Sequence, residues 1–182
     1  MEKYIAILRG INVSGSKMIK MDDLKLSMSE LNFKNIETYI QSGNLVFKYT
    51  KTNQHDLAKK IKYKIQKDFG FQVPVIVKNS QELNFLIAHN SFINERNEPV
   101  DKLHVTFLAE EPPVGWQEKL AGTDANSDEF IILKDVIYIF CLNGYGRTKL
   151  NNNYFEAKLK ISATTRNWKT VLKLAEMINA ES

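Results

Sequence analysis

Residues 4–15 read Tyr4-Ile5-Ala6-Ile7-Leu8-Arg9-Gly10-Ile11-Asn12-Val13-Ser14-Gly15. An apolar run passes directly into Arg, Gly and Asn, and then into further Gly and Ser. A run of this length bounded by turn residues predicts a buried strand that ends at a polar loop with a flexible backbone.

The residues after this loop predict a known topology for the first part of the chain. Apolar residues at three- and four-residue spacing indicate helices, and alternating β-branched and aromatic residues indicate strands. Pro74 favours an edge position for its strand, and Ser42-Gly43 predicts a tight hairpin turn. The expected order is strand 3–9, helix 21–31, strand 35–41, strand 44–49, helix 57–69 and strand 73–78. This is the order of the ferredoxin-like βαββαβ plait, in which the third strand lies between the first two.

That topology brings the loop 9–12 and the turn 41–44 to the same edge of the sheet. The candidate ligand-binding residues there are Arg9, Asn12, Gln41, Ser42 and Asn44. A guanidinium offers a planar set of donors to a phosphate or carboxylate, and glycines let backbone N–H groups approach an anion. The alternative is structural, because Asn and Ser beside Gly commonly satisfy their own backbone and Arg9 can pair with an internal carboxylate.

The second half repeats the pattern more loosely and predicts a second α+β lobe of related topology. Its expected elements are helix 80–89, strand 102–108, a short helix ending at residue 120, a hairpin 130–133/136–142, and two closing helices at 151–160 and 165–179. The predicted domains are therefore 1–78 and 79–182. Arg147 and Lys149 follow the hairpin. Arg166 and Asn167 open the last predicted helix, where free N–H groups attract anions. The alternative there is a simple helix cap with Trp168 in the core.

Charge is distributed unevenly along the chain. Residues 1–78 carry 14 Lys/Arg and 7 Asp/Glu, residues 79–135 carry 4 and 11, and residues 136–182 carry 7 and 3. Basic surfaces attract nucleic acid or phosphorylated ligands. A lysine-rich helix face, however, is more often simply the solvent-exposed side of the helix. The predicted helix 57–69 has five such lysines on its outer face: Lys59, Lys60, Lys62, Lys64 and Lys67. Its neighbouring strands make a poor base-stacking platform, because Phe47 and Tyr49 are expected to face the helices.

Several functional classes lack a signature. The three histidines are isolated, so no metal site is predicted, and no cofactor motif or nucleophile elbow is present. No apolar run reaches membrane-spanning length, and the N-terminus does not resemble a signal peptide. The single cysteine, Cys141, lies in an apolar run and is expected to be buried and reduced, which favours a cytoplasmic setting. The oligomeric state stays open.

Four blocks of sequence resemble the family called domain of unknown function 1697. They are residues 8–13 followed by Gly15, residues 38–47, residues 146–150 and residues 163–171. Ser14 and Thr148 differ from the family pattern, which tends to have Gly and Ser there. The resemblance implies an α+β protein with a plait-like N-terminal half, and it implies no activity.

Together these observations predict a protein that binds an anionic ligand, either a nucleic acid or a phosphorylated small molecule. The predicted site is the edge formed by the Arg9–Asn12 loop and the Gln41–Asn44 turn, over which Arg147, Lys149, Arg166 and Asn167 close. One alternative is an enzyme that acts on a phosphorylated metabolite. The other is a protein-interaction module whose polar motifs are purely structural.

Overall fold

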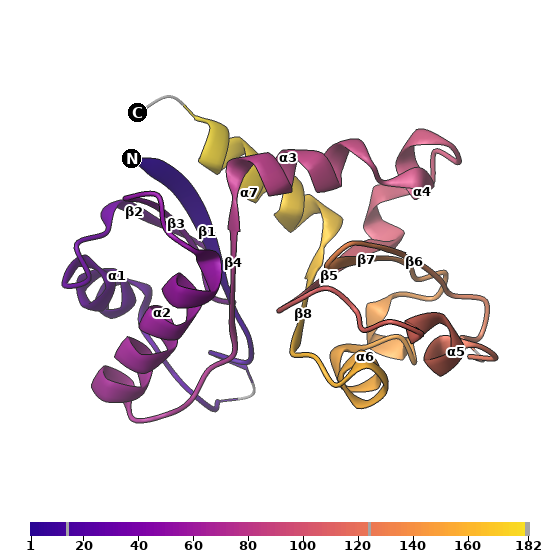
Figure 1. The fold of residues 1–182 in the computed structure, drawn as a ribbon, viewed down its shortest axis with the longest axis horizontal. Helices are drawn as coiled ribbons and strands as arrows, with labels where there is room; N and C mark the ends of the chain where they lie inside the picture. The colour runs from indigo at the N-terminus through magenta and orange to yellow at the C-terminus, as the bar shows by residue number, and fades with distance from the viewer. Residues whose placement is uncertain (14, 124, 181–182) are drawn as a thin grey trace. The chain divides into compact units, whose positions relative to one another are not determined.

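The protein has two four-stranded antiparallel sheets, each accompanied by helices, so the predicted α+β class is confirmed (Figure 1). The structure is a computed structural model that describes residues 1–13, 15–123 and 125–180. Ser14, which belongs to the predicted loop and to the family resemblance, lies outside the described residues.

The first sheet has the predicted plait topology, with strand order β2-β3-β1-β4. Pro74 directly precedes β4, which lies at an edge as expected. The elements are β1 (Glu2–Leu8), α1 (Met21–Ser29), β2 (Lys34–Tyr39), β3 (Asn44–Tyr49), α2 (Gln54–Phe69) and β4 (Val75–Asn79).

Both faces of β1 are buried, which explains its continuous apolar sequence. Tyr4, Ala6 and Leu8 point into the core beneath α1 and α2, as expected from side-chain alternation along a strand. Ile5 and Ile7 point to the opposite face and are also fully buried. Lys3 shares that opposite face, and its Nζ donates a hydrogen bond to the Ala180 carbonyl just beyond the last helix.

The second sheet has strand order β6-β7-β5-β8, which repeats the order of the first sheet strand for strand. The remaining elements are α3 (Ser80–Ala88), α4 (Ser91–Asn94), the 3₁₀ turn η1 (Val100–Lys102), β5 (Leu103–Leu108), α5 (Trp116–Leu120), β6 (Glu129–Leu133), β7 (Val136–Phe140), the 3₁₀ turn η2 (Tyr145–Arg147), α6 (Asn152–Leu159), β8 (Ala163–Asn167) and α7 (Trp168–Asn179). The chain therefore contains two plaits of the same connectivity.

The last helix was predicted to span residues 165–179, and its predicted start was wrong. Residues Ala163–Asn167 form β8, which pairs antiparallel with β5, and α7 begins only at Trp168. Thr165 lies opposite Thr106, and their hydroxyl oxygens are 2.6 Å apart. β-Branched residues suit strands, and this cross-strand contact stabilises the pairing. A strand therefore separates the two helices expected at the C-terminus.

Two smaller predictions also needed correction. The hairpin turn between β2 and β3 spans residues 40–43 rather than Ser42-Gly43 alone, with left-handed backbone at both Ile40 and Gly43. Lys64 is not on the outer face of α2: it is buried, with its Nζ 2.5 Å from Glu30 and 2.8 Å from Asp68. The two carboxylates raise the pKa of Lys64.

The chain divides into two compact units. Unit 1 comprises Met1–Asn84 together with the residues from Lys173 onward, and unit 2 comprises Phe85–Leu172. Each unit has its own core; in unit 2, Ile137 and Ile139 pack with Phe155 from α6. The predicted division into domains 1–78 and 79–182 stays a prediction. Among the described residues, no helix is long and apolar enough to cross a membrane.

Candidate functional site

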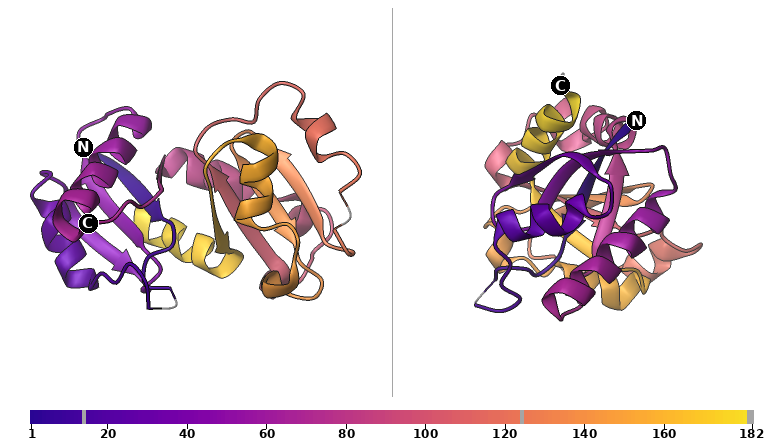
Figure 2. Two further views of the ribbon diagram at one scale, coloured as in Figure 1. Left: turned by 90° about the horizontal axis from the view of Figure 1, so that it is seen from below. Right: turned by 90° about the vertical axis from the view of Figure 1, so that its left-hand side faces the viewer.

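The loop after β1 and the turn between β2 and β3 lie together, as the topology predicted. The backbone N–H of Leu8 donates to the Gly43 carbonyl at 2.8 Å. We call residues 9–13, 15–20 and 40–43 the loop edge of unit 1. Figure 2 shows the connection between β1 and α1 extending beyond the end of the strands.

Asn12 ties the two parts of the loop edge to each other. Its Nδ2 donates to the carbonyls of Ile19 and Gln41, both at 2.9 Å, and its Oδ1 accepts the Ile19 N–H at 2.7 Å. The backbone of Asn12 is left-handed, with φ 54°, which Asn tolerates better than other side chains. We call this arrangement the Asn12 clasp. Both side-chain amide hydrogens of Asn12 are therefore used inside the protein, and a ligand-binding role for Asn12 stays a prediction.

The side chain of Asn44 also makes hydrogen bonds inside the protein. It is fully buried, and its Nδ2 donates to the Tyr39 carbonyl at 3.0 Å and to the Ser42 hydroxyl at 3.1 Å. Gly43 beside it has φ 78°, and a Cβ added there would lie 2.8 Å from the Leu8 Cβ. The turn is therefore held rigidly against the end of β1.

The outward side of the loop edge is more apolar than the sequence motifs suggested. Val13, Met18 and Ile40 are 54%, 63% and 48% exposed. Gln41 is exposed as well, whereas Arg9 is half-buried. Sequence reasoning concentrated on the polar residues and missed these three. The available signal was the presence of apolar residues inside loops otherwise made of Gly, Ser, Asn and Lys.

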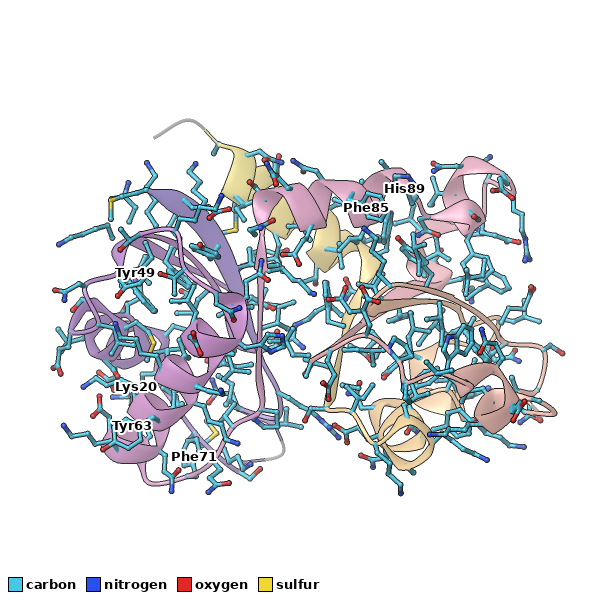
Figure 3. All side chains as sticks on the ribbon, in the orientation of Figure 1. Lys20, Tyr49, Tyr63, Phe71, Phe85 and His89 are labelled. Atoms are coloured by element: carbon cyan, nitrogen blue, oxygen red, sulfur yellow. The ribbon has the colours of Figure 1, made fainter. Side chains whose placement is uncertain are left out.

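A groove of about 710 Å³ opens beside Gln41, at the start of α1. Its lining residues are Met18, Ile19, Lys20, Met21, Asp22, Asp23, Gln41 and Phe69. Figure 3 labels Lys20 on this unit. Asp22 pairs with Lys25 at 2.8 Å, and that ammonium lowers the pKa of the Asp22 carboxyl. The groove thus combines thioether and aromatic surface with two carboxylates and one ammonium, and this balance does not favour a free anion.

Unit 2 has the same sheet order as unit 1, so a comparison of the two shows which features of the loop edge the fold itself requires. There the N–H of Leu108 donates to the Asp135 carbonyl at 2.9 Å, which matches the bond from Leu8 to Gly43. However, the connection from β5 to α5 is only residues 109–115, which contain no asparagine, and the turn between β6 and β7 has two residues. The plait therefore requires the backbone bond but not the longer, clasped loop of unit 1.

The remaining predicted site residues belong to unit 2. Arg147 and Lys149 are exposed, at the end of η2 and just beyond it. The Nη1 of Arg166, in β8, donates to the Thr165 carbonyl at 2.9 Å, and burial lowers the pKa of its guanidinium to about 10. The Oδ1 of Asn167 accepts the Thr170 N–H at 2.8 Å, so Asn167 caps α7. That these four residues close over the loop edge stays a prediction.

Metal and thiol chemistry have no preassembled site in the part of the chain that the structure describes. No group of three or more His, Cys, Asp and Glu side chains is placed to hold a metal ion among residues 1–13, 15–123 and 125–180. Cys141 is buried as expected, and burial raises the pKa of its thiol to about 11. A thiol in that state is a poor nucleophile.

The fold and the loop edge define a two-plait α+β protein with a clasped loop in its first unit. The chain belongs to the family described as protein of unknown function (DUF1697), whose model matches residues 1–138. This confirms the resemblance seen in the sequence motifs. No curated protein matches the chain.

One similar solved structure is the conserved bacterial protein SP0830 from Streptococcus pneumoniae. It is 18% identical, with a TM-score of 0.72, and the alignment covers 98% of this chain and 99% of that one. At this identity the similarity establishes the fold alone.

Proposed function

We propose that this protein is a protein-interaction module and that its partner binds at the loop edge of unit 1. The partner is a protein segment with apolar side chains that cover Val13, Met18 and Ile40. The observation that carries the proposal is the Asn12 clasp, which ties together Asn12, Ile19 and Gln41, the chain neighbours of these three exposed apolar residues. A preorganised surface loses little conformational entropy on binding, and this favours affinity.

The comparison between the two plaits supports a functional role for the loop edge. Unit 2 forms the same sheet order with a shorter connection and a shorter turn. The additional length and the clasp in unit 1 are therefore not demands of the fold. Lys17 and Lys20 add positive charge to the loop edge, and Asp22 and Asp23 add negative charge in the adjoining groove. The exposed apolar side chains, not a net charge, therefore define the favoured partner segment.

A second candidate is the binding of an anionic ligand at the same edge, which the sequence predicted. Arg9, Lys17 and Lys20 on the connection after β1 favour it. Asp22 and Asp23 in the adjoining groove oppose it, as does the internal use of the Asn12 and Asn44 amides. An enzyme acting on a phosphorylated metabolite stays a prediction.

The test is a selection of random peptides displayed on phage against the immobilised full chain. Recovered peptides are then measured against the wild type and against the triple variant Val13→Ser/Met18→Ser/Ile40→Ser. The matched control is Leu26→Ser/Val114→Ser/Leu142→Ser, which removes three exposed apolar side chains elsewhere. We expect apolar peptides whose affinity falls at least tenfold in the first variant and stays unchanged in the control.

Two outcomes contradict the proposal. One is equal loss of affinity in both triple variants, which would indicate general stickiness. The other is a blank selection together with a rise in melting temperature on adding inorganic pyrophosphate that Arg9→Ala abolishes. That result would support the anionic ligand instead, because a ligand that binds the native state stabilises it.

A further inference from the structure

Helix α2 presents a basic row with an aromatic ring at its centre. Tyr63 is 71% exposed, and Lys59, Lys62 and Lys67 beside it are exposed as well. Lys59, Tyr63 and Lys67 are four residues apart, so they lie on one side of the helix with a rise of about 6 Å per step. We call Lys59, Lys62, Tyr63 and Lys67 the Tyr63 row. Figure 3 labels Tyr63 on α2.

The other two lysines of α2, Lys60 and Lys64, make side-chain contacts within unit 1. The Nζ of Lys60 donates to the Tyr49 hydroxyl at 2.9 Å and lies 4.8 Å from the centre of that ring. Lys64 is held between Glu30 and Asp68. In the Tyr63 row, Lys59 has Asp56 at 4.0 Å, and both side chains are well exposed, so this pairing contributes little. The structure thus divides the five lysines into two anchoring residues and three outward-facing residues.

The helix that carries the row is firmly anchored. Leu57, Ile61 and Ile65 are buried in the core of unit 1. The side chain of Asn53 caps its start and Gly70, in a left-handed conformation, closes its end. An exposed ring on an anchored helix is a rigid platform. It is not a membrane-binding face, because the apolar face of α2 is already buried and the outer face offers one aromatic residue.

We propose that the Tyr63 row binds single-stranded nucleic acid, with a base stacked on the Tyr63 ring and phosphates paired with the lysines on either side. Lysines around a solvent-exposed aromatic ring are the combination that sequence-tolerant single-strand binding uses. A base in a duplex is already stacked on its neighbours, so the exposed ring favours an unpaired strand. The usual platform of a plait is the face of its central strands that the helices leave open, and here that face is closed because Ile5 and Ile7 on it are fully buried.

The experiment measures the anisotropy of a fluorescein-labelled oligothymidine of roughly 16 nucleotides, a length within known single-strand site sizes. The full chain is compared with Tyr63→Ala, Tyr63→Phe and the double variant Lys59→Ala/Lys67→Ala. The charge-matched control is Lys119→Ala/Lys158→Ala, which removes two exposed lysines from unit 2.

We expect Tyr63→Ala to weaken binding roughly 5- to 150-fold, the range associated with losing one stacked base. Tyr63→Phe keeps the ring and therefore keeps the affinity. The Lys59/Lys67 variant lowers the slope of log K against log salt by about 1.4, because two phosphate contacts are lost. The Lys119/Lys158 control leaves affinity and slope unchanged.

Four results would overturn the proposal. They are the absence of binding at low salt, a Tyr63→Ala variant that binds like the wild type, a control that weakens binding as much as the Lys59/Lys67 variant, and displacement of the oligonucleotide by poly-glutamate at equal charge concentration. The last result would mean that the row recognises negative charge alone, as an acidic protein would supply it.

Discussion

Replacing Asn12 by Ala tests whether the Asn12 clasp holds the loop edge together. The substitution removes three side-chain hydrogen bonds, two donated to the carbonyls of Ile19 and Gln41 and one accepted from the Ile19 N–H. At about 0.5–1.5 kcal/mol each, and taking the lower part of that range because Asn12 is half-exposed, these bonds contribute about 2 kcal/mol. Placing Ala in a left-handed conformation costs about 1 kcal/mol more.

The expected loss is therefore about 3 kcal/mol of unfolding free energy, a large fraction of a typical total of about 5–15 kcal/mol. With a urea m-value of about 2 kcal/mol/M, the midpoint falls by about 1.5 M. Circular dichroism is the suitable probe, because both tryptophans, Trp116 and Trp168, lie in unit 2 and do not report directly on unit 1.

Asn35 provides the matched control. It is exposed and has φ 49°, so Asn35→Ala carries the conformational cost of about 1 kcal/mol without breaking the clasp. Asn12→Gly separates the two terms, since it relieves the left-handed strain and is expected to lose about 2 kcal/mol. If Asn12→Ala is no more destabilising than Asn35→Ala, the clasp does not stabilise the loop edge and the preorganisation argued for it is lost.

Three further predictions concern stability. Gly43→Ala is expected to cost at least about 3 kcal/mol, because it adds a contact of 2.8 Å to an unfavourable backbone, whereas Gly10→Ala meets no atom within 4 Å and should cost about 1 kcal/mol; equal thermal shifts would refute this. Burial lowers the pKa of His104, so the unfolded state binds the proton more readily and stability should fall as pH drops below about 6.5; His104→Gln should flatten that part of the pH–stability curve. Lys64→Met should reduce the acid sensitivity of unfolding, because Lys64 lowers the pKa of Asp68 and the resulting stabilisation is lost as pH falls below about 4; an unchanged acid limb would contradict it.

The first plait was predictable from sequence because its signals are local and strong. The apolar face of α2 recurs at helical spacing and ends at a glycine, and the run in β1 is long enough to be a buried strand. Once the order of elements was known, the handedness and connection rules left few topologies. The same rules predicted that Arg9–Asn12 and Gln41–Asn44 lie at one edge.

β8 was missed because its identity depends on a distant partner. Residues Ala163–Asn167 directly precede the apolar stripe of α7, so a local pattern extends the helix backwards over them. Thr165 becomes part of a strand because β5 supplies its backbone partners and Thr106 its side-chain neighbour. That partner is 59 residues away in sequence, and periodicity within a short window does not detect it.

The role of each residue at the loop edge was likewise decided by tertiary contacts. The sequence identified Asn12 and Asn44 as polar residues at the predicted edge of the sheet. It left open whether they bind a ligand or hold the loops in place. The structure directs the Asn12 amide to a loop carbonyl and the Asn44 amide to the carbonyl that ends β2. It leaves Val13, Met18 and Ile40 exposed. The same holds for Lys64, which has the sequence context of a surface lysine but is buried beside Glu30.

Sequence alone therefore determined the family, the α+β class, the first plait and the two segments that meet at its edge, because periodicity, turn chemistry and chain connectivity are properties of neighbouring residues. Only the tertiary structure decided that β8 completes a second plait in the second half, that Asn12 ties the loop edge together, and which lysines of α2 face outward. These outcomes depend on which distant backbone and side-chain groups satisfy each hydrogen bond and each charge, and the folded arrangement alone specifies those partners.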